Sequence, residues 1–484
     1  MPSRFAGERA DCKLTLASHT VPIKHRDLGK LLAEAVRLLR YHRYLRQICA
    51  LMRLIRSLSI ERSLGWSLAL LLAFSFVAAV PAAQTVLMVT VGLSAIATTL
   101  RNRNFLRDAV TPQLVGALMC WCVIASASSF WSPGPLRSIE ASMLSCWLPA
   151  ACFLAALHAA RSESASRLLV HGIQIGLTWL YLSMASISFL GYFGALSTVS
   201  GGDVGPSSLF LVRCYPGPGL SSTFILLAMP VLVWATAAGL ISKRSGFLYV
   251  GFGIVCGAVT YNRMFWLGVI LLLAVLLLNA SRSVLNRDSL LRALAAIIVC
   301  AVVLAAAVVA STLVRYNYGF TLLGIQRALA MIASDGRFMI WTEWLKIGEM
   351  APLLGAGFGK MAAAHQYQDL IQQGIKRGMT PFANVHPHNL FLSLWIQTGV
   401  LGLVSFTWLI AALVRELFRL SIAGSLSSRQ TMLAGLSLVG MLILKNSTDD
   451  FYDKAVPVIF WILSGLLLGS ARSRLPQNFQ LNEG

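Results

Sequence analysis

The chain has 484 residues, of which 57% are hydrophobic and only 12% are charged. Soluble globular proteins carry about 25% charged residues, so this composition argues against a soluble enzyme. Lys and Arg nevertheless outnumber Asp and Glu by 40 to 19. A nucleic-acid-binding protein needs a basic face on a polar surface, which apolar runs of about 20 residues do not provide. A protein with many membrane spans explains both features, because Lys and Arg collect in cytoplasmic loops.

The first 62 residues contain 13 Lys and Arg and no apolar run long enough to cross a bilayer. A cleavable signal peptide is therefore not expected. Apolar residues between Leu31 and Leu58 recur at helical spacing with arginines among them, which predicts a basic amphipathic helix lying on anionic lipid headgroups. The alternatives are a poorly ordered cytoplasmic tail, or upstream sequence added by a wrong start choice with Met52 as the true first residue.

Apolar runs after residue 62 predict an all-α polytopic membrane protein with about 12 transmembrane helices. None of these predicted spans has an Asp or Glu in its apolar interior, which weakens an ion-coupled transporter as the interpretation. The predicted spans are 64–80, 84–100, 112–130, 141–159, 168–192, 220–241, 246–262, 264–280, 291–311, 389–413, 430–445 and 455–470.

The distribution of basic residues sets the orientation. With the N-terminus inside, 28 of the 40 Lys and Arg lie on the cytoplasmic side, so both termini are predicted to be cytoplasmic. The expected organisation is a basic N-terminal segment (1–62), a transmembrane domain (63–472) and a cytoplasmic tail (473–484).

One outer connection, residues 312–388, is far longer than a link between two spans requires. It carries several Lys and Arg although the topology rule disfavours positive charge outside, which indicates a function for that charge. Apolar residues from Leu322 to Leu345 follow helical spacing, so two or three amphipathic helices are expected on the outer face of the membrane.

A histidine pair ends this outer connection, in the sequence His386-Pro387-His388-Asn389. A histidine at the membrane edge can take a proton from a hydroxyl, and Asn389 can orient a sugar or a main-chain group. A structural, interfacial role is the default for either histidine alone. Two histidines are too few ligands for a metal site, so we expect no metal and no cofactor.

Arginines on the outer face suit a diphosphate, because guanidinium groups form bidentate bonds with phosphate oxygens. Arg213 and Arg337 are the candidates, and Arg263 at the mouth of a span is the one most easily explained by headgroup contact.

Two further segments leave alternatives open. The segment 354–360, Leu-Gly-Ala-Gly-Phe-Gly-Lys, lacks the spacing of a phosphate-binding loop and is expected to be a flexible turn. Asp449, Asp450 and Asp453 either hold an arginine of the site in place or form a solvated loop.

Three segments resemble the O-antigen ligase and polymerase superfamily of bacterial membrane glycosyltransferases. The ligase motif H-[NSQ]-x9-G-x-x-G is matched by His388-Asn389 and Gly399-Val400-Leu401-Gly402. The family pattern of Arg, Trp and PLLGxGxG is matched by Arg337, Trp341 and residues 352–357. The family arginine before the middle spans is matched by Arg213, although the Gly-x-x-x-Pro-Asn that usually follows is replaced by residues 219–223, Gly-Leu-Ser-Ser-Thr.

The resemblance implies a metal-independent, inverting glycosyltransferase of the bacterial inner membrane, with 312–388 as a periplasmic loop. His388 would be the base, Arg213 and Arg337 would bind the diphosphate of a polyprenyl-linked glycan donor, and Asn389, Trp341, Arg263 and His386 would contact substrate. The acceptor is a lipid A core, another glycan or a protein, and membrane lipids are the other partners; no nucleic acid is expected. The alternatives are a twelve-span transporter or flippase for a lipid or small solute, and a structural subunit of a polysaccharide export complex.

Overall fold

The computed structural model describes residues 60–77, 81–101, 111–192, 215–260, 262–280, 319–333, 336–377, 385–422, 426–453 and 455–473, together with Met379 and isolated positions between 295 and 313. The chain divides into two units, Met1–Ser59 and Ile60–Gly484, and the description concerns the second. The predicted basic helix of the N-terminal segment, most of the predicted span 291–311 and most of the C-terminal tail lie outside the described residues.

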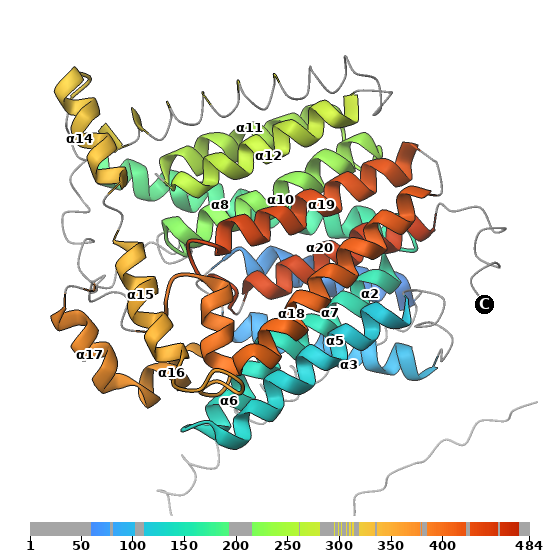
Figure 1. Ribbon diagram of the computed structural model, residues 1–484. Coiled ribbons are helices and arrows are strands. Elements are labelled where there is room, and N and C mark those ends of the chain that lie inside the picture. The colour runs from blue at the N-terminus through green and yellow to red at the C-terminus, as the bar shows by residue number, and fades with distance from the viewer. Residues whose placement is uncertain are drawn as a thin grey trace, which may run out of the picture. The chain divides into compact units, whose positions relative to one another are not determined.

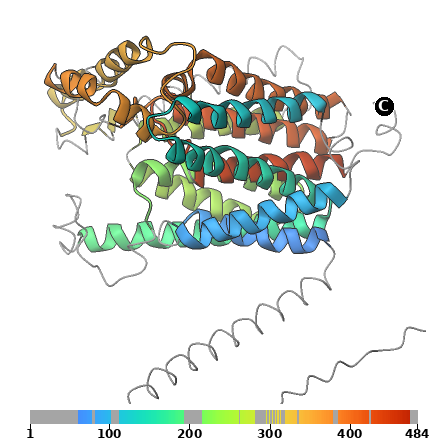
Figure 2. The ribbon, with the colours of Figure 1, turned by 90° about the horizontal axis from the view of Figure 1, so that it is seen from below.

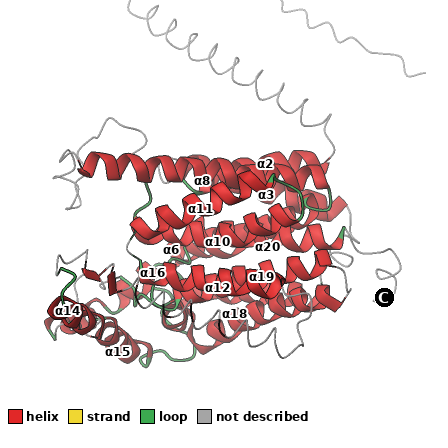
Figure 3. Ribbon diagram, turned by 90° about the horizontal axis from the view of Figure 1, so that it is seen from above, coloured by secondary structure: helices red, strands yellow, loops and turns green. Residues whose placement is uncertain are grey.

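All regular secondary structure within the described ranges is helical, as Figure 3 shows, and this confirms the predicted all-α class. Helices suit a membrane protein, because the backbone N–H and C=O groups of a helix form hydrogen bonds within the segment itself and need no water. The long helices are α2 (Ile60–Ser75), α3 (Pro81–Arg101), α5 (Pro112–Ala127), α7 (Leu148–Ala159), α8 (Glu163–Tyr192), α10 (Pro218–Ala237), α11 (Lys243–Val259), α12 (Arg263–Ala280), α18 (Leu390–Ile422), α19 (Leu426–Asn446) and α20 (Ala455–Arg472). A 3-10 turn η1 (Ser128–Trp131) follows α5, and α6 (Pro135–Ser142) continues through a π-helical turn η2 (Met143–Trp147) into α7.

Local sequence signals mark where several of these helices begin. Proline occupies the first position of α3, α5, α6 and α10, where its missing N–H has no helical partner to lose. Thr111 Oγ1 accepts a hydrogen bond from the Leu114 N–H (3.4 Å), and Ser242 Oγ accepts one from the Ser245 N–H (3.2 Å). These N-caps satisfy backbone donors that the first turns of α5 and α11 would otherwise leave unpaired.

Six helical segments in the described part of the chain are long and apolar enough to cross a membrane, so the predicted count of twelve is not confirmed. Arg62–Ser75, Ala83–Thr98 and Arg263–Val275 are shorter apolar helices of the described residues. The six segments are Pro112–Trp131, Pro135–Ala159, Glu163–Ser188, Pro218–Ala237, Leu390–Leu420 and Ala455–Arg472.

Helix α20 lies at the centre of the bundle, and every residue from Val456 to Ala471 is buried. It packs along α7, while α2 packs on α8, α18 on α5 and α10 on α19. A Cβ atom at Gly465 or Gly469 would come within 2.5 Å of a carbonyl oxygen of α7. Small residues four apart therefore let these two helix backbones approach closely, as is common where helices pack inside membranes.

The long connection before α18 contains four helices in its described part: α14 (Leu322–Ala333), α15 (Arg337–Gly348), α16 (Lys360–Gln366) and α17 (Gln368–Lys376). The first two coincide with the predicted amphipathic segments. Figures 1 and 2 show these helices gathered at one end of the long helices, next to the start of α18. This end of the bundle carries the candidate functional residues.

Candidate functional site

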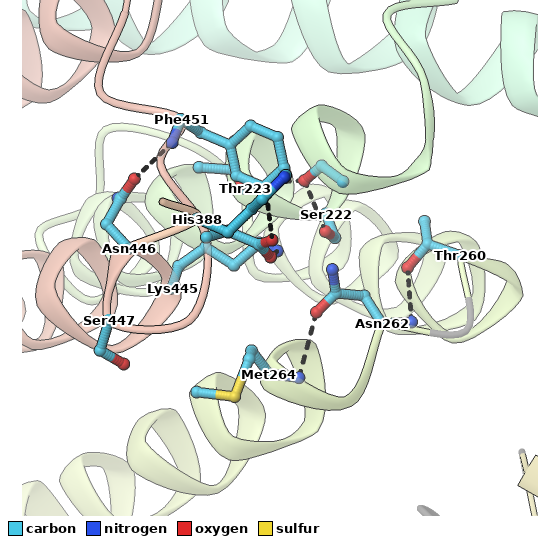
Figure 4. Close-up of polar contacts among 12 residues, drawn as sticks. Ser222, Thr223, Thr260, Asn262, Met264, His388, Lys445, Asn446, Ser447 and Phe451 are labelled. Atoms are coloured by element: carbon cyan, nitrogen blue, oxygen red, sulfur yellow. Dashed lines mark hydrogen bonds and ion pairs between the residues drawn. The ribbon is translucent and has the colours of Figure 1, made fainter. Parts of the chain in front are cut away.

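Segments far apart in the sequence meet at this end of the bundle. They are the first residue of α15, the turn that precedes α18, the first turn of α10 and the loop between α19 and α20, here called the α19–α20 loop (residues 447–453). Figure 4 shows His388, Lys445 and Phe451 next to one another beside Ser222 and Thr223 of α10.

The centre of this cluster is the carboxylate of Asp449. Its Oδ1 atom lies 3.8 Å from Nη2 of Arg337 and 3.8 Å from Nδ1 of His388. Its Oδ2 atom accepts a hydrogen bond from Nζ of Lys445 (3.0 Å). Asp449 is 8% exposed and Lys445 is fully buried, so one carboxylate links two cations and the candidate base. Asp449 and Asp450 are thus buried, and Asp449 lies beside the candidate arginine Arg337.

Asp449 is ionised in this setting. Burial alone would raise the pKa of its carboxyl group, because a low dielectric disfavours the charged form. The polar contact with His388 and the positive charges of Lys445 and Arg337 outweigh burial, and the pKa of Asp449 lies below its ordinary value. The carboxylate is thus negative near neutral pH and attracts both Arg337 and a protonated His388.

Hydrogen bonds to its main chain hold the α19–α20 loop in place. Asn389 Nδ2 donates to the carbonyl oxygen of Ser447 (2.8 Å), and Lys360 Nζ donates to that of Asp450 (2.5 Å). The Phe451 N–H donates to Asn446 Oδ1 (2.8 Å). The loop is anchored at both sides of Asp449, so the position of that carboxylate is set by the surrounding helices.

Asn389 serves a second purpose, because its Oδ1 atom accepts a hydrogen bond from the Leu392 N–H (3.0 Å). This contact caps the first turn of α18. Both ends of its amide are thus engaged with main-chain groups, one on α18 and one on the α19–α20 loop.

The two histidines have different environments. The backbone N–H of His388 donates to Nδ1 of His386 (3.3 Å), and the two rings lie 4.2 Å apart, centroid to centroid. Burial, the Lys360 charge and His388 lower the pKa of His386 to about 3, so His386 is neutral under ordinary conditions. Of the two, His388 lies beside Asp449 and has the geometry of a base oriented by a carboxylate.

His388 has a φ of +52°, an unfavourable left-handed conformation for a residue with a side chain. Such backbone strain persists where the surrounding structure imposes it, and it is concentrated at functional sites. Here the turn of residues 386–389 leads directly into α18.

Helix α15 carries Arg337 as its first residue and Trp341 one turn later. The helix is fixed by its own small core with α16, α17 and α18, in which Trp344 and Ile347 are buried. Trp341 packs edge-on against Phe338 (5.5 Å), and its buried Nε1 has no hydrogen-bond partner among the described residues. Arg337 and Trp341 lie four positions apart on one helix, so their side chains project in similar directions.

An ion-pair cluster joins α15 to the end of α17. Glu343 is 6% exposed, accepts from Lys346 Nζ (2.8 Å) and also pairs with Arg377. Hydrogen bonds from Lys346 and Arg377 lower the pKa of Glu343. This cluster fixes the rotation of the helix that presents Arg337.

Comparison with known families identifies part of the chain. Residues 248–407 match the family described as O-Antigen ligase. The chain carries an O-antigen ligase domain. This match confirms the predicted superfamily, whose members carry out glycosyl transfer, and together with the apolar helices it indicates a multi-pass membrane protein of polysaccharide biosynthesis. No curated protein matches the chain.

The ligase domain contains most of the candidate residues but not all of the cluster. Arg337, His388 and Asn389 lie within the matched segment, whereas Asp449 and Lys445 follow it. The last helices of the chain therefore complete the cluster that the ligase domain begins.

The glycines of the ligase motif have a structural explanation. Gly399 has a φ of +65° at a kink within α18, and a Cβ there would lie 2.0 Å from the carbonyl oxygen of Leu353. A Cβ on Gly402 would lie 1.8 Å from Thr398 Oγ1. The kink therefore requires glycine at position 399, and the segment that follows α15 packs against it.

The glycine-rich segment 354–360 docks on this kink. The N–H groups of Ala356 and Gly357 donate to the carbonyl oxygens of Ile396 and Gln397 (both 2.8 Å). Those of Phe358 and Gly359 donate to side-chain oxygens of Ser128 and Gln397. These donors are already used, so the segment is a packed connection and not a cradle for phosphate, and it places Lys360 beside Asp450.

The structure describes only one of the two remaining candidate arginines, Arg213 and Arg263. Arg213 lies outside the described residues. Arg263 is the first residue of α12, after Asn262, whose Oδ1 accepts from the Met264 N–H (3.1 Å).

Sequence reasoning missed Lys445 and Lys360 as parts of the site. A lysine followed four residues later by an aspartate, at the end of an apolar helix, was the available signal of a buried pair. For Lys360 the sequence offers no such signal, because its partner Asp450 lies 90 residues away.

Proposed function

We propose that the protein transfers a glycan from a polyprenyl-diphosphate-linked donor to an acceptor hydroxyl at the periplasmic face of the bacterial inner membrane. In this proposal the chain has about twelve spans and both termini are cytoplasmic. Residues 312–388 form a periplasmic loop, and its helices bring the diphosphate-binding arginine to the outer edge of the bilayer.

The reaction is an inverting displacement at the anomeric carbon of the donor sugar. His388 takes the proton of the acceptor hydroxyl, the acceptor oxygen bonds to the anomeric carbon, and the bond from that carbon to the diphosphate oxygen breaks. The Nδ1 atom of His388 lies beside Asp449, so we assign Nε2 to the proton transfer. Asp449 stabilises the imidazolium that results.

The leaving diphosphate gains negative charge as the bond breaks. Arg337 and Arg213 offset this charge through their guanidinium groups, which removes the need for a metal ion or an acid on the leaving group. Trp341, Arg263, Asn389 and His386 surround the substrates in this proposal. Of these, Asn389 and His386 act mainly by fixing the turn that carries His388.

The observation that carries the proposal is the position of Asp449 between Arg337 and His388. Arg337 Nη2 and His388 Nδ1 each lie 3.8 Å from the same carboxylate oxygen, so these two nitrogen atoms are at most twice that distance apart. A histidine base and a cation for the diphosphate are thus held next to one another by a single carboxylate. The family match independently favours glycosyl transfer.

The test is transfer in vitro by the full-length protein in lipid nanodiscs. A defined polyprenyl-diphosphate glycan is supplied with three acceptor classes, namely lipid A core, a second lipid-linked glycan and a hydroxyl-bearing peptide. Product glycan and released polyprenyl diphosphate are both measured. Transfer should be lost in His388→Ala and in Arg337→Ala, and retained in the controls His171→Ala and Arg327→Ala, whose side chains are exposed elsewhere on α8 and α14.

Retained transfer in both His388→Ala and Arg337→Ala contradicts the mechanism. Movement of the intact donor across sealed vesicles without release of diphosphate would instead identify a transporter or flippase. The anomeric configuration of the product, determined by NMR, checks inversion. Unchanged transfer in the presence of EDTA checks that no divalent metal is required.

A further inference from the structure

A large cavity is lined by chain segments that also carry the candidate site. Its volume is about 900 Å³, within the range of cavities that hold small ligands. One wall is formed by residues 133–145, which include α6 and part of η2. The opposite wall comes from residues 358–365, from the start of α18 and from the α19–α20 loop. Figure 1 shows α6, α16 and the start of α18 close together.

This cavity shares its chain segments with the proposed catalytic cluster. Val385 and Leu390 line it and flank the turn that carries His388. Asp450, which follows Asp449 in the loop, also lines it, and Lys360 lies 3.5 Å from the carboxylate of Asp450. Neither His388 nor Arg337 lines the cavity, but the residues that flank His388 in the chain do, and so does the residue that follows Asp449.

The charged groups in the cavity wall are more acidic than basic. Glu140, Asp450 and Asp453 are carboxylates, and Arg137 and Lys360 are cations. Both cations have partners in the wall: Lys360 binds the main chain and side chain of Asp450, and Arg137 Nη1 lies 3.2 Å from His365 Nε2. The electrostatic balance of the wall disfavours a second anion in the cavity.

The remaining lining combines apolar surface with hydrogen-bonding groups. Leu144, Phe358, Leu390 and Leu394 supply apolar area, and Gln397 an amide. The C–H faces of sugar rings pack on apolar side chains while their hydroxyls donate to carboxylates and amides. A hydrocarbon chain would cover carboxylates without offering them any donor, which is unfavourable.

We propose that this cavity is the acceptor site and that it binds an uncharged, hydroxyl-rich glycan in preference to a phosphate-bearing one. The assignment rests on the proposed glycosyl transfer, since an acceptor site is meaningful only for that reaction. The donor diphosphate then lies on the Arg337 side of the Asp449 cluster and the acceptor hydroxyl reaches His388 from the cavity.

The π-helical turn η2 provides a matched pair of variants. Leu144 lines the cavity, whereas its neighbour Met143 is 44% exposed on the outside of the bundle. Leu144→Trp should fill the cavity, and Met143→Trp adds the same group outside it. Because both changes lie in the same turn, a general effect on folding is expected to be similar for the two.

Binding is measured by saturation-transfer NMR on the full-length protein in nanodiscs, without donor. The probes are uncharged hexose trisaccharides and the same trisaccharides carrying a 6-phosphate. The uncharged probes should bind at least about tenfold more tightly than their phosphates, a difference near 1.4 kcal/mol. Leu144→Trp should abolish binding and Met143→Trp should retain it. Glu140→Lys combined with Asp453→Lys should reverse the preference for uncharged probes.

Equal or tighter binding of the phosphorylated probes overturns the proposal, as does absence of binding by every uncharged probe. Displacement of the bound trisaccharide by polyprenyl diphosphate would assign the cavity to the donor, which also overturns it. These readouts do not depend on transfer. If the transfer assay fails, the proposed function fails; if transfer occurs but only phosphorylated acceptors are used, the function stands and the acceptor proposal is wrong.

Discussion

Replacing Asp449 with Asn tests the cluster most directly. The side chain keeps its shape and can still accept a hydrogen bond from Lys445, but its negative charge is removed. Lys445 is fully buried, so its charge loses the carboxylate that lies 3.0 Å away. Removing one partner of a buried ion pair typically costs about 3–5 kcal/mol of stability.

The effect on catalysis follows from the other two contacts. Arg337 and His388 each lie 3.8 Å from Asp449 Oδ1. With an effective dielectric constant near 20, a unit charge pair at that distance interacts by about 4 kcal/mol, and the partial exposure of Arg337 reduces this figure. Loss of a carboxylate that orients a catalytic histidine lowers kcat by about 10²–10⁴-fold. We expect a loss in that range for glycan transfer by Asp449→Asn.

A double variant separates the two effects. In Asp449→Asn with Lys445→Met the buried cation is also removed, so thermal stability in detergent should recover to near that of the wild type. Transfer should not recover, because Arg337 and His388 still lack their common carboxylate. Recovery of transfer together with stability would refute the reasoning, since Asp449 would then serve only to neutralise Lys445.

Three further outcomes are expected. Gly399→Ala should lower the free energy of unfolding by more than about 2 kcal/mol, because φ is +65° and the new Cβ meets a carbonyl oxygen. The control Gly116→Ala, which has open space around it, should be neutral or stabilising by about 0.5–1 kcal/mol. Thermal unfolding measures both. The pKa of His386 is lower in the folded protein, so as pH falls the unfolded chain binds a proton at this residue before the folded protein does. His386 therefore lowers the free energy of unfolding as pH falls from about 6.5 to about 3. His386→Asn should flatten that part of the plot of stability against pH, and an unchanged plot would contradict the lowered pKa. Arg337→Lys should reduce kcat/KM for transfer by about 10–100-fold, because the charge stays but the bidentate guanidinium fork is lost. The control Arg327→Lys on α14 should leave kcat/KM unchanged. If Arg337→Lys also leaves kcat/KM unchanged, only the positive charge at residue 337 matters.

The sequence alone predicted the all-helical class of the protein, which the structure confirms. Apolar runs and few charges predict an all-helical membrane protein, because only internally hydrogen-bonded helices satisfy the backbone in lipid in such a chain. The motif that joins His388 and Asn389 to Gly399 and Gly402 also lies within one short stretch. These residues lie directly before or within α18, so local spacing was sufficient to relate them to one another.

The count of about twelve spans rests on hydropathy alone. In the described part of the chain, six helical segments are long and apolar enough to cross a membrane. The end of a helix depends on its capping residues and on its packing. An average of hydropathy along the sequence carries no information about either.

The site itself was decided by tertiary structure. Arg337, His388 and Asp449 come from three different segments, and no periodicity or motif relates their positions. The glycine-rich segment 354–360, expected to be a flexible turn, is packed against the kink of α18 because that kink exposes the carbonyl oxygens that its N–H groups bind. Local sequence determines which helices form and which of their faces are apolar. Only the packing of those helices brings one carboxylate between an arginine and a histidine, because that contact depends on the relative positions of elements distant in the chain.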